Sequence, residues 1–176
     1  AAVYASSWVN SPGVRAAIHA VGVNPLGLDA TATAAPPNYD GVNIFDGASG
    51  TIIGATTAGA RNVISGNIYA GVATATNPFE TSSPTANNIV EGNYIGLNAA
   101  GTAAVANGTG ISLGGYSSGN IIGGTSAGAR NIISGNTSYG VGSSATVVGN
   151  FIEGNYIGTN PAGTVAIPNL SGGINL

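Results

Sequence analysis

The chain repeats itself, and the length of the repeat restricts the folds that it can adopt. Residues 50–67 (GTIIGATTAGARNVISGN) return as residues 119–136 (GNIIGGTSAGARNIISGN). Residues 88–107 (NIVEGNYIGLNAAGTAAVAN) return as residues 150–169 (NFIEGNYIGTNPAGTVAIPN), and a weaker copy of this second motif lies at residues 24–38. Self-similarity at such periods indicates an architecture in which each repeat stacks on its neighbours.

A Gly opens each unit after the first, and in four of these units it is followed directly by Val or Ile. We distinguish type A units, which carry AGARNxISGN, from type B units, which carry EGNYIG and a loop of the form NxAGTxAxxN. Their order is B-A-B-A-B. The predicted single domain 1–176 thus consists of units 1–40, 41–70, 71–109, 110–139 and 140–171, followed by a partial unit 172–176.

The apolar residues of each unit lie in short β-rich runs, such as VNIF, TIIG and NVISG, which Gly and Asn separate. Runs of this kind, bounded by turn residues, are typical of strands. Three runs per unit, with parallel and therefore right-handed connections, predict an all-β fold. We expect a single-stranded right-handed parallel β-helix (β-solenoid) of about five coils. Residues 11–21 have helical spacing and form either a short helix or an inserted loop.

Equivalent motif positions should lie above one another in successive coils. We assign the Asn that precedes each apolar pair to an amide ladder and one apolar residue of the pair to an internal column. The Gly that follows should adopt positive φ, at Gly66, Gly92, Gly135 and Gly154. The predicted structural ladder comprises Asn62, Asn88, Asn131 and Asn150, and the predicted column comprises Ile64, Val90, Ile133 and Ile152.

Composition excludes several classes of function. Only 5% of residues are charged, there is no Lys, and the three Arg do not form a basic run, so we predict no nucleic-acid partner. The chain has no Cys and therefore no disulfide or thiol chemistry. No apolar run approaches the ~20 residues of a spanning helix, so we predict no membrane insertion.

The polar residues offer no convincing catalytic constellation. Glu91 and Glu153 resemble an acid pair, but they occupy the same motif position in two units. Arg61 and Arg130 are likewise motif twins, which we expect to bond a neighbouring loop or turn, and His19 is the only histidine. We therefore predict no enzyme activity and no catalytic, cofactor-binding or metal site. The remaining acids that we considered for a metal cluster lie singly, at Asp29, Asp40 and Asp46.

The two extremities of the sequence suggest how the domain assembles. An open solenoid end exposes unpaired backbone and apolar core, which another coil can cover. Residues 172–176 (GGINL) have the pattern of a core strand without a polar cap, and residues 1–3 align with the start of a unit. We therefore predict Val3, Ile174 and Leu176 as assembly ends, at which one copy binds the next head to tail.

The motifs GTIIGATTAGARNVISGN and NNIVEGNYIGLNAAGTA resemble the right-handed parallel β-helix repeats of large secreted and cell-surface bacterial proteins. The resemblance implies the same fold and an extracellular or cell-surface, prokaryotic setting, but it implies no activity. The leading hypothesis is an extracellular structural subunit that polymerises into a filament. One alternative is a rod or stalk segment of a larger adhesin, with surface glycans or other cells as partners. Another is a polysaccharide lyase or hydrolase of the β-helix class.

Overall fold

The computed structural model of the chain describes residues 17–18, 37–44, 47–74, 84–143 and 147–176. These residues form short strands and one 3-10 helix, η1 (Ala58–Ala60). None of the helices in these ranges has the length and hydropathy needed to cross a membrane. The strands are β1 (Ala17–Ile18), β2 (Asp40–Ile44), β3 (Ile52–Gly54), β4 (Val63–Ile64), β5 (Ala70–Thr74), β6 (Ile89–Glu91), β7 (Tyr94–Ile95), β8 (Thr109–Leu113), β9 (Ile121–Gly123), β10 (Ile132–Ile133), β11 (Tyr139–Ser143), β12 (Phe151–Glu153), β13 (Tyr156–Ile157) and β14 (Gly172–Asn175).

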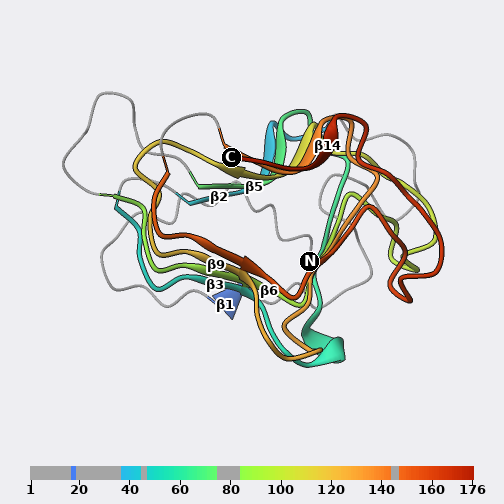
Figure 1. Cartoon of the computed structure of the whole chain (residues 1–176), viewed down its shortest axis with the longest axis horizontal. Coiled ribbons are helices and arrows are strands. Elements are labelled where there is room, and N and C mark those ends of the chain that lie inside the picture. Colours follow the sequence, from blue (N-terminus) through green and yellow to red (C-terminus); the bar gives the residue numbers. More distant parts are fainter. Residues whose placement is uncertain (1–16, 19–36, 45–46, 75–83, 144–146) are drawn as a thin grey trace.

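The strands form three parallel sheets. The first sheet has the order β1-β3-β6-β9-β12, the second has the order β13-β10-β7-β4, and the third has the order β14-β11-β8-β5-β2. Neighbouring strands of one sheet therefore come from successive units. Figure 1 shows β3, β6 and β9 side by side on one wall of the molecule, with β2 and β5 on the opposite wall. The fold is all-β, with parallel strands in stacked sheets, which is consistent with a β-solenoid.

The strands of the third sheet begin within one residue of the unit starts at 41, 71, 110, 140 and 172. The last of these differs slightly from the alignment of the sequence motifs. Tyr139 pairs with Gly172 and Val141 with Ile174, so Gly173 rather than Gly172 is the equivalent of Gly140. In the stretch 11–21, Ala17 and Ile18 form β1 beside Ile52 and Ile53, and the rest of that stretch lies outside the described residues.

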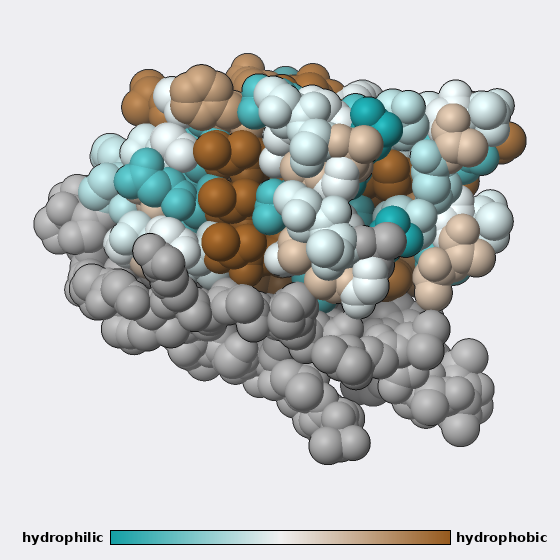
Figure 2. All heavy atoms as spheres, turned by 90° about the horizontal axis from the view of Figure 1, so that it is seen from below, coloured by the Kyte–Doolittle hydropathy of each residue, from teal (hydrophilic) through white to brown (hydrophobic). Residues whose placement is uncertain are grey.

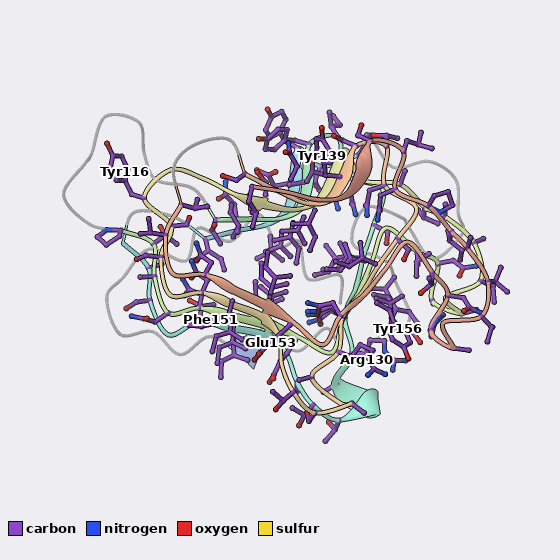
Figure 3. All side chains as sticks on the ribbon, in the orientation of Figure 1. Tyr116, Arg130, Tyr139, Phe151, Glu153 and Tyr156 are labelled. Atoms are coloured by element: carbon purple, nitrogen blue, oxygen red, sulfur yellow. The ribbon has the colours of Figure 1, made fainter. Side chains whose placement is uncertain are left out.

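The interior contains three apolar columns, one from each sheet (Figure 3). The predicted single column is wrong, because its members belong to two sheets. Ile64 and Ile133 lie in the second sheet, separated by Ile95. The other two members lie in the first sheet, where Ile122 separates Val90 from Ile152. Among the side chains that the structure describes, the columns are Ile53, Val90, Ile122 and Ile152; Ile64, Ile95, Ile133 and Ile157; and Val42, Val72, Ile111, Val141 and Ile174.

The asparagines form three ladders rather than the single one predicted. In each ladder the backbone N–H and the side-chain Nδ2 of one Asn donate to Oδ1 of the Asn in the following unit. The predicted ladder joined Asn62 and Asn131 to Asn88 and Asn150, but these are members of two separate ladders. The ladders are Asn88, Asn120 and Asn150; Asn62, Asn93, Asn131 and Asn155; and Asn67, Asn107, Asn136 and Asn169.

The predicted left-handed backbone at four glycines is confirmed, with φ between 67° and 78° at Gly66, Gly92, Gly135 and Gly154. Gly92 also makes a close approach that excludes a side chain. A Cβ atom at Gly92 would lie 2.1 Å from the carbonyl oxygen of Ala55 in the preceding unit. Turns at this corner therefore require glycine because of both the backbone conformation and the distance between units.

Candidate interaction surface

The C-terminal end of the described structure presents three strand edges that no other described strand covers, two from unit 140–171 and one from the partial unit 172–176. Strands β12, β13 and β14 each stand at the end of their sheet and pair on one side only. An unpaired edge exposes a row of backbone donors and acceptors, which makes it a template for a further strand. We call these three edges the terminal edge.

Apolar side chains lie uncovered along the terminal edge. Ile152 and Ile157 end the columns of the first two sheets and are only partly buried. In the third column, Ile174 is 49% exposed, whereas Val141 one unit earlier is 0% exposed. The predicted assembly residue Leu176 is 70% exposed. The structure thus places Ile174 and Leu176 at this edge, while Val3 lies outside the described residues.

The three asparagine ladders give the terminal edge a defined polarity. The side chains of Asn150, Asn155 and Asn169 accept hydrogen bonds from the preceding unit through Oδ1. Their Nδ2 atoms donate back to carbonyls of Ser117, Ile122 and Ile133, at 2.8–3.0 Å. In earlier units the backbone N–H of each ladder Asn donates to Oδ1 of the Asn in the following unit. Within the described residues, the backbone N–H groups of Asn150, Asn155 and Asn169 have no such acceptor. The terminal edge is therefore the donor end of all three ladders.

The opposite polarity is visible at the start of the third ladder. Oδ1 of Asn67 is buried and accepts no hydrogen bond in the described part of the chain. A buried acceptor without a donor is unfavourable, so within the described residues the third ladder has an unsatisfied acceptor at Asn67 and an unused backbone donor at Asn169. A ladder of this kind can grow only when the added unit has the same orientation as the existing ones.

A loop distinguishes the B units from the A units and lies outside the second sheet. This B loop spans residues 97–104 in one B unit and residues 159–166 in the next, and antiparallel bridges join Leu97 to Ala104 and Thr159 to Ala166. Asn98 Oδ1 accepts from the backbone N–H of Thr102 at 2.9 Å, and Asn160 accepts from Thr164 at the same distance. The motif NxAGT therefore closes a compact turn.

Each B loop is attached to the A unit that precedes it. Ser134 Oγ accepts from the backbone N–H groups of Gly158 and Thr159, at 3.0 and 2.9 Å, and donates to the carbonyl of Thr159 at 2.8 Å. Gly135 N–H donates to the carbonyl of Ile167 at 3.1 Å. Ser65 makes the equivalent bond to Leu97 at 2.7 Å. The Ser of the ISGN motif is thus an anchor for the loop of the next unit.

The two motif arginines also join an A unit to the following B unit. The Cζ atoms of Arg61 and Arg130 lie 4.1 Å from the ring centroids of Tyr94 and Tyr156, respectively. Figure 3 shows Arg130 beside Tyr156 on the outside of the molecule. Arg130 Nε donates to the carbonyl of Gly154 at 2.9 Å, which confirms the expected bond to a neighbouring turn for Arg130. Nε of Arg61 is buried and has no hydrogen-bond partner within the described residues. Cation–π contacts at such sites typically contribute ~0.5–1 kcal/mol.

The residues considered for catalysis do not converge in the described structure. Glu91 in β6 and Glu153 in β12 belong to the first sheet, and β9 lies between these strands. Within the described ranges no three acidic or histidine side chains group as metal ligands. His19, Asp29 and Asp46 lie outside those ranges.

Asp40 in β2 has a partly buried carboxyl group. Burial raises the pKa of its carboxyl above the ordinary value, and a backbone hydrogen bond from Ala70 N–H (3.2 Å) opposes this shift. The Asn43 amide donates to the other carboxylate oxygen at 3.3 Å. These contacts hold strand β2 in place and do not form a catalytic group.

An apolar stripe on the outer face of the first sheet was not predicted from the sequence. Ile52, Ile89, Ile121 and Phe151 pair in register along β3, β6, β9 and β12. Figure 2 shows an apolar column on this face, and Phe151 is 58% exposed. Alignment of TIIG in the A units with NIVEG in the B units would have revealed the stripe.

The chain was compared with known proteins. No protein-family model, no curated protein and no solved structure matches it.

Proposed function

We propose that this chain is an extracellular structural protein, a right-handed β-solenoid of about five coils that stacks head to tail into a filament. The terminal edge carries the proposal. It combines three parallel strands that each have one unpaired edge, an uncovered apolar column end at Ile174 and unused ladder donors at Asn150, Asn155 and Asn169. The likeness of the repeats to secreted and surface β-helix proteins supports an extracellular, prokaryotic setting.

The magnitudes favour association at this edge. About 10 backbone hydrogen bonds at ~0.5–1.5 kcal/mol each roughly match the cost of association, ~4–15 kcal/mol. Hydrogen bonds alone would therefore leave the equilibrium balanced. Burial of about 400 Å² of apolar end surface at ~25 cal/mol/Å² adds ~10 kcal/mol. This apolar contribution shifts the balance toward stacking.

A second candidate function is a rod or stalk segment of a larger cell-surface adhesin, whose partners would be surface glycans or other cells. The regular alternation of A and B units supports it, because the same alternation can continue through further units. An enzymatic role as a polysaccharide lyase or hydrolase has less support, since Glu91 and Glu153 are separated by β9. We propose no cofactor and no nucleic-acid partner.

Negative-stain microscopy of the purified chain at increasing concentration tests the filament. We expect rods that lengthen with concentration and are one solenoid wide. The variant Ile174→Lys places a charge at the terminal edge and should abolish the rods. The variant Tyr116→Lys is the matched control, because Tyr116 is 59% exposed and lies between β8 and β9, away from that edge. Discrete monomers of the unmodified chain at high concentration would contradict the filament.

A further inference from the structure

We infer that Asn107-Gly108 is a deamidation site that the fold keeps unreactive, and that its reaction in an unfolded chain prevents the third asparagine ladder from forming again. This inference goes beyond the proposed function and does not depend on it. Attack by a backbone nitrogen on the preceding Asn side chain is fastest when that nitrogen belongs to Gly, because no Cβ atom shields it. In the sequence, Asn107 is the only Asn that is followed by Gly.

The structure requires both residues of this dipeptide. Asn107 belongs to the third ladder, in which its side chain bonds to Asn67 and Asn136. A Cβ atom at Gly108 would lie 2.4 Å from the carbonyl oxygen of Tyr69, which is closer than two such atoms can approach. The missing Cβ that lets the two units lie close together is therefore also the feature that makes the dipeptide reactive.

The folded chain engages every reacting group in a hydrogen bond. The nucleophile, Gly108 N–H, donates to the carbonyl of Asn67 at 3.2 Å. The leaving group, Nδ2 of Asn107, donates to Oδ1 of Asn136 at 3.0 Å and to the carbonyl of Ile64 at 3.1 Å. Oδ1 of Asn107 accepts from the backbone N–H and from Nδ2 of Asn67, at 3.1 and 2.7 Å. Ring closure therefore requires the third ladder to open.

In an opened or unfolded chain the reaction needs only water. The Gly108 nitrogen forms a bond to Cγ of Asn107 while the Cγ–Nδ2 bond breaks, and Nδ2 leaves as ammonia together with the proton of the Gly108 nitrogen. Water then opens the resulting cyclic imide at either of its two carbonyl groups. The product at position 107 is aspartate or, with Cβ included in the main chain, isoaspartate. The reaction involves no oxidant and no reductant.

Neither product can replace Asn107 in the ladder. A carboxylate has no donor, so it cannot bond to Oδ1 of Asn136 or to the carbonyl of Ile64. It would also place a negative charge at a position that is only 1% exposed. Isoaspartate lengthens the main chain by one atom, so the residues that follow lose their register with the neighbouring units. Deamidation thus makes the loss of the third ladder permanent.

Peptide mass spectrometry of the unmodified chain tests the inference. The protein is incubated at mildly alkaline pH in native buffer and in guanidinium chloride, and the deamidated fraction is followed at each Asn. In guanidinium chloride we expect Asn107 to react before every other Asn. In native buffer we expect its rate to be lower by roughly 10³-fold or more, because the folding equilibrium limits the open population. After dilution of the denaturant, the refolded fraction measured by circular dichroism should fall as deamidation at Asn107 rises.

The variant Asn107→Asp isolates the effect of the product, and Asn98→Asp is its matched control. Oδ1 of Asn98 accepts from the backbone N–H groups of Thr102 and Ala103, and a carboxylate at this exposed position keeps both bonds. We expect Asn107→Asp to lower Tm by roughly 10 °C or more and Asn98→Asp to change it by about 2 °C or less.

The two parts of the inference fail on different results. Comparable deamidation rates at Asn107 in native buffer and in guanidinium chloride would overturn the protection by the fold. Full refolding of chains deamidated at Asn107, or equal Tm values for Asn107→Asp and Asn98→Asp, would overturn the loss of the ladder. If Asn107→Asp does not fold at all, the refolding of the unmodified chain decides the second part, because that measurement needs no variant.

Discussion

The A unit 110–139 and the B unit 140–171 share a framework but differ at one corner. Both contribute one residue to each apolar column and one Asn to each ladder. At the end of the second-sheet strand, however, the A unit has Ser134 and the B unit has Gly158, followed by the B loop. The comparison teaches that the columns and ladders make the units stack, whereas the corner determines which unit follows which.

The shared core should be equally important in both unit types. Ile133 in the A unit and Ile95 in the B unit are both 0% exposed and belong to one column. We expect Ile133→Ala and Ile95→Ala each to lower the free energy of unfolding by about 2–5 kcal/mol. Urea denaturation measures the loss, with Val165→Ala at a 56% exposed position as the control. A loss confined to one of the two variants would break the equivalence of the cores.

The corner position should respond differently in the two types. Gly96 in the B unit has φ of 87°, and a Cβ atom there would lie 2.3 Å from the carbonyl oxygen of Ser134. We expect Gly96→Ala to cost roughly 2–4 kcal/mol from left-handed strain and overlap together. Gly50→Ala is the control, since Gly50 has φ of 68° but no atom within 4 Å of the added Cβ. Equal losses of Tm would show that backbone strain alone, rather than contact between units, requires glycine.

In the A unit, the residue that aligns with Gly96 is Ser134. Ser134→Ala removes the hydroxyl acceptor of the Thr159 backbone N–H and one of the two acceptors of the Gly158 N–H, which also donates to the carbonyl of Ile133. We expect a loss of about 1–3 kcal/mol. Hydrogen exchange should become faster at Thr159, with little change at the amide of Ile95. Ser138→Ala, in the same unit, should leave both the stability and the exchange unchanged. Unaltered exchange in the B loop of the Ser134 variant would contradict its role as anchor.

The smallest expected effect concerns β2, which is the only described strand of the third sheet that begins with an acid. Asp40 aligns with Ala70, which aligns in turn with Thr109. Because burial raises the pKa of Asp40 in the folded state, its ionisation destabilises the fold as pH rises from acid toward neutral values. We expect Asp40→Asn to raise Tm slightly at neutral pH, where the carboxyl is charged, and to have no effect at about pH 3. A lower Tm at neutral pH would mean that the charged hydrogen bonds outweigh the burial.

Motif comparison within one unit type was accurate, but comparison across types was not. Asn62 and Asn131 do share a ladder, and so do Asn88 and Asn150. The error was to join these two pairs. Both pairs stand in the same local pattern, an Asn, two apolar residues, one variable residue and then Gly-Asn, which occurs at residues 62–67 and at residues 88–93. The pattern therefore identifies a strand and its turn but does not identify the sheet.

The candidate site was predictable only in part. The exposed strand pattern of Ile174 and Leu176 is visible in the sequence because GGINL repeats the start of earlier units. The role of Ser134 is not visible, because its three hydrogen bonds go to residues 24 and 25 positions later in the chain. The stripe at Ile52, Ile89, Ile121 and Phe151 was hidden for a related reason, since it becomes apparent only when the first-sheet strands of both types are aligned.

The repeat in the sequence by itself determined that short strands of successive units would pair in parallel, because like residues recur at unit length and every turn carries glycine and asparagine. Only the tertiary structure decided which strand of an A unit lies on which strand of a B unit. The physical reason is that two strands of each unit have nearly the same pattern of apolar side chains. Their register is selected by contacts between units, namely the asparagine bonds, the close glycine approaches and the anchoring of each B loop by the preceding unit.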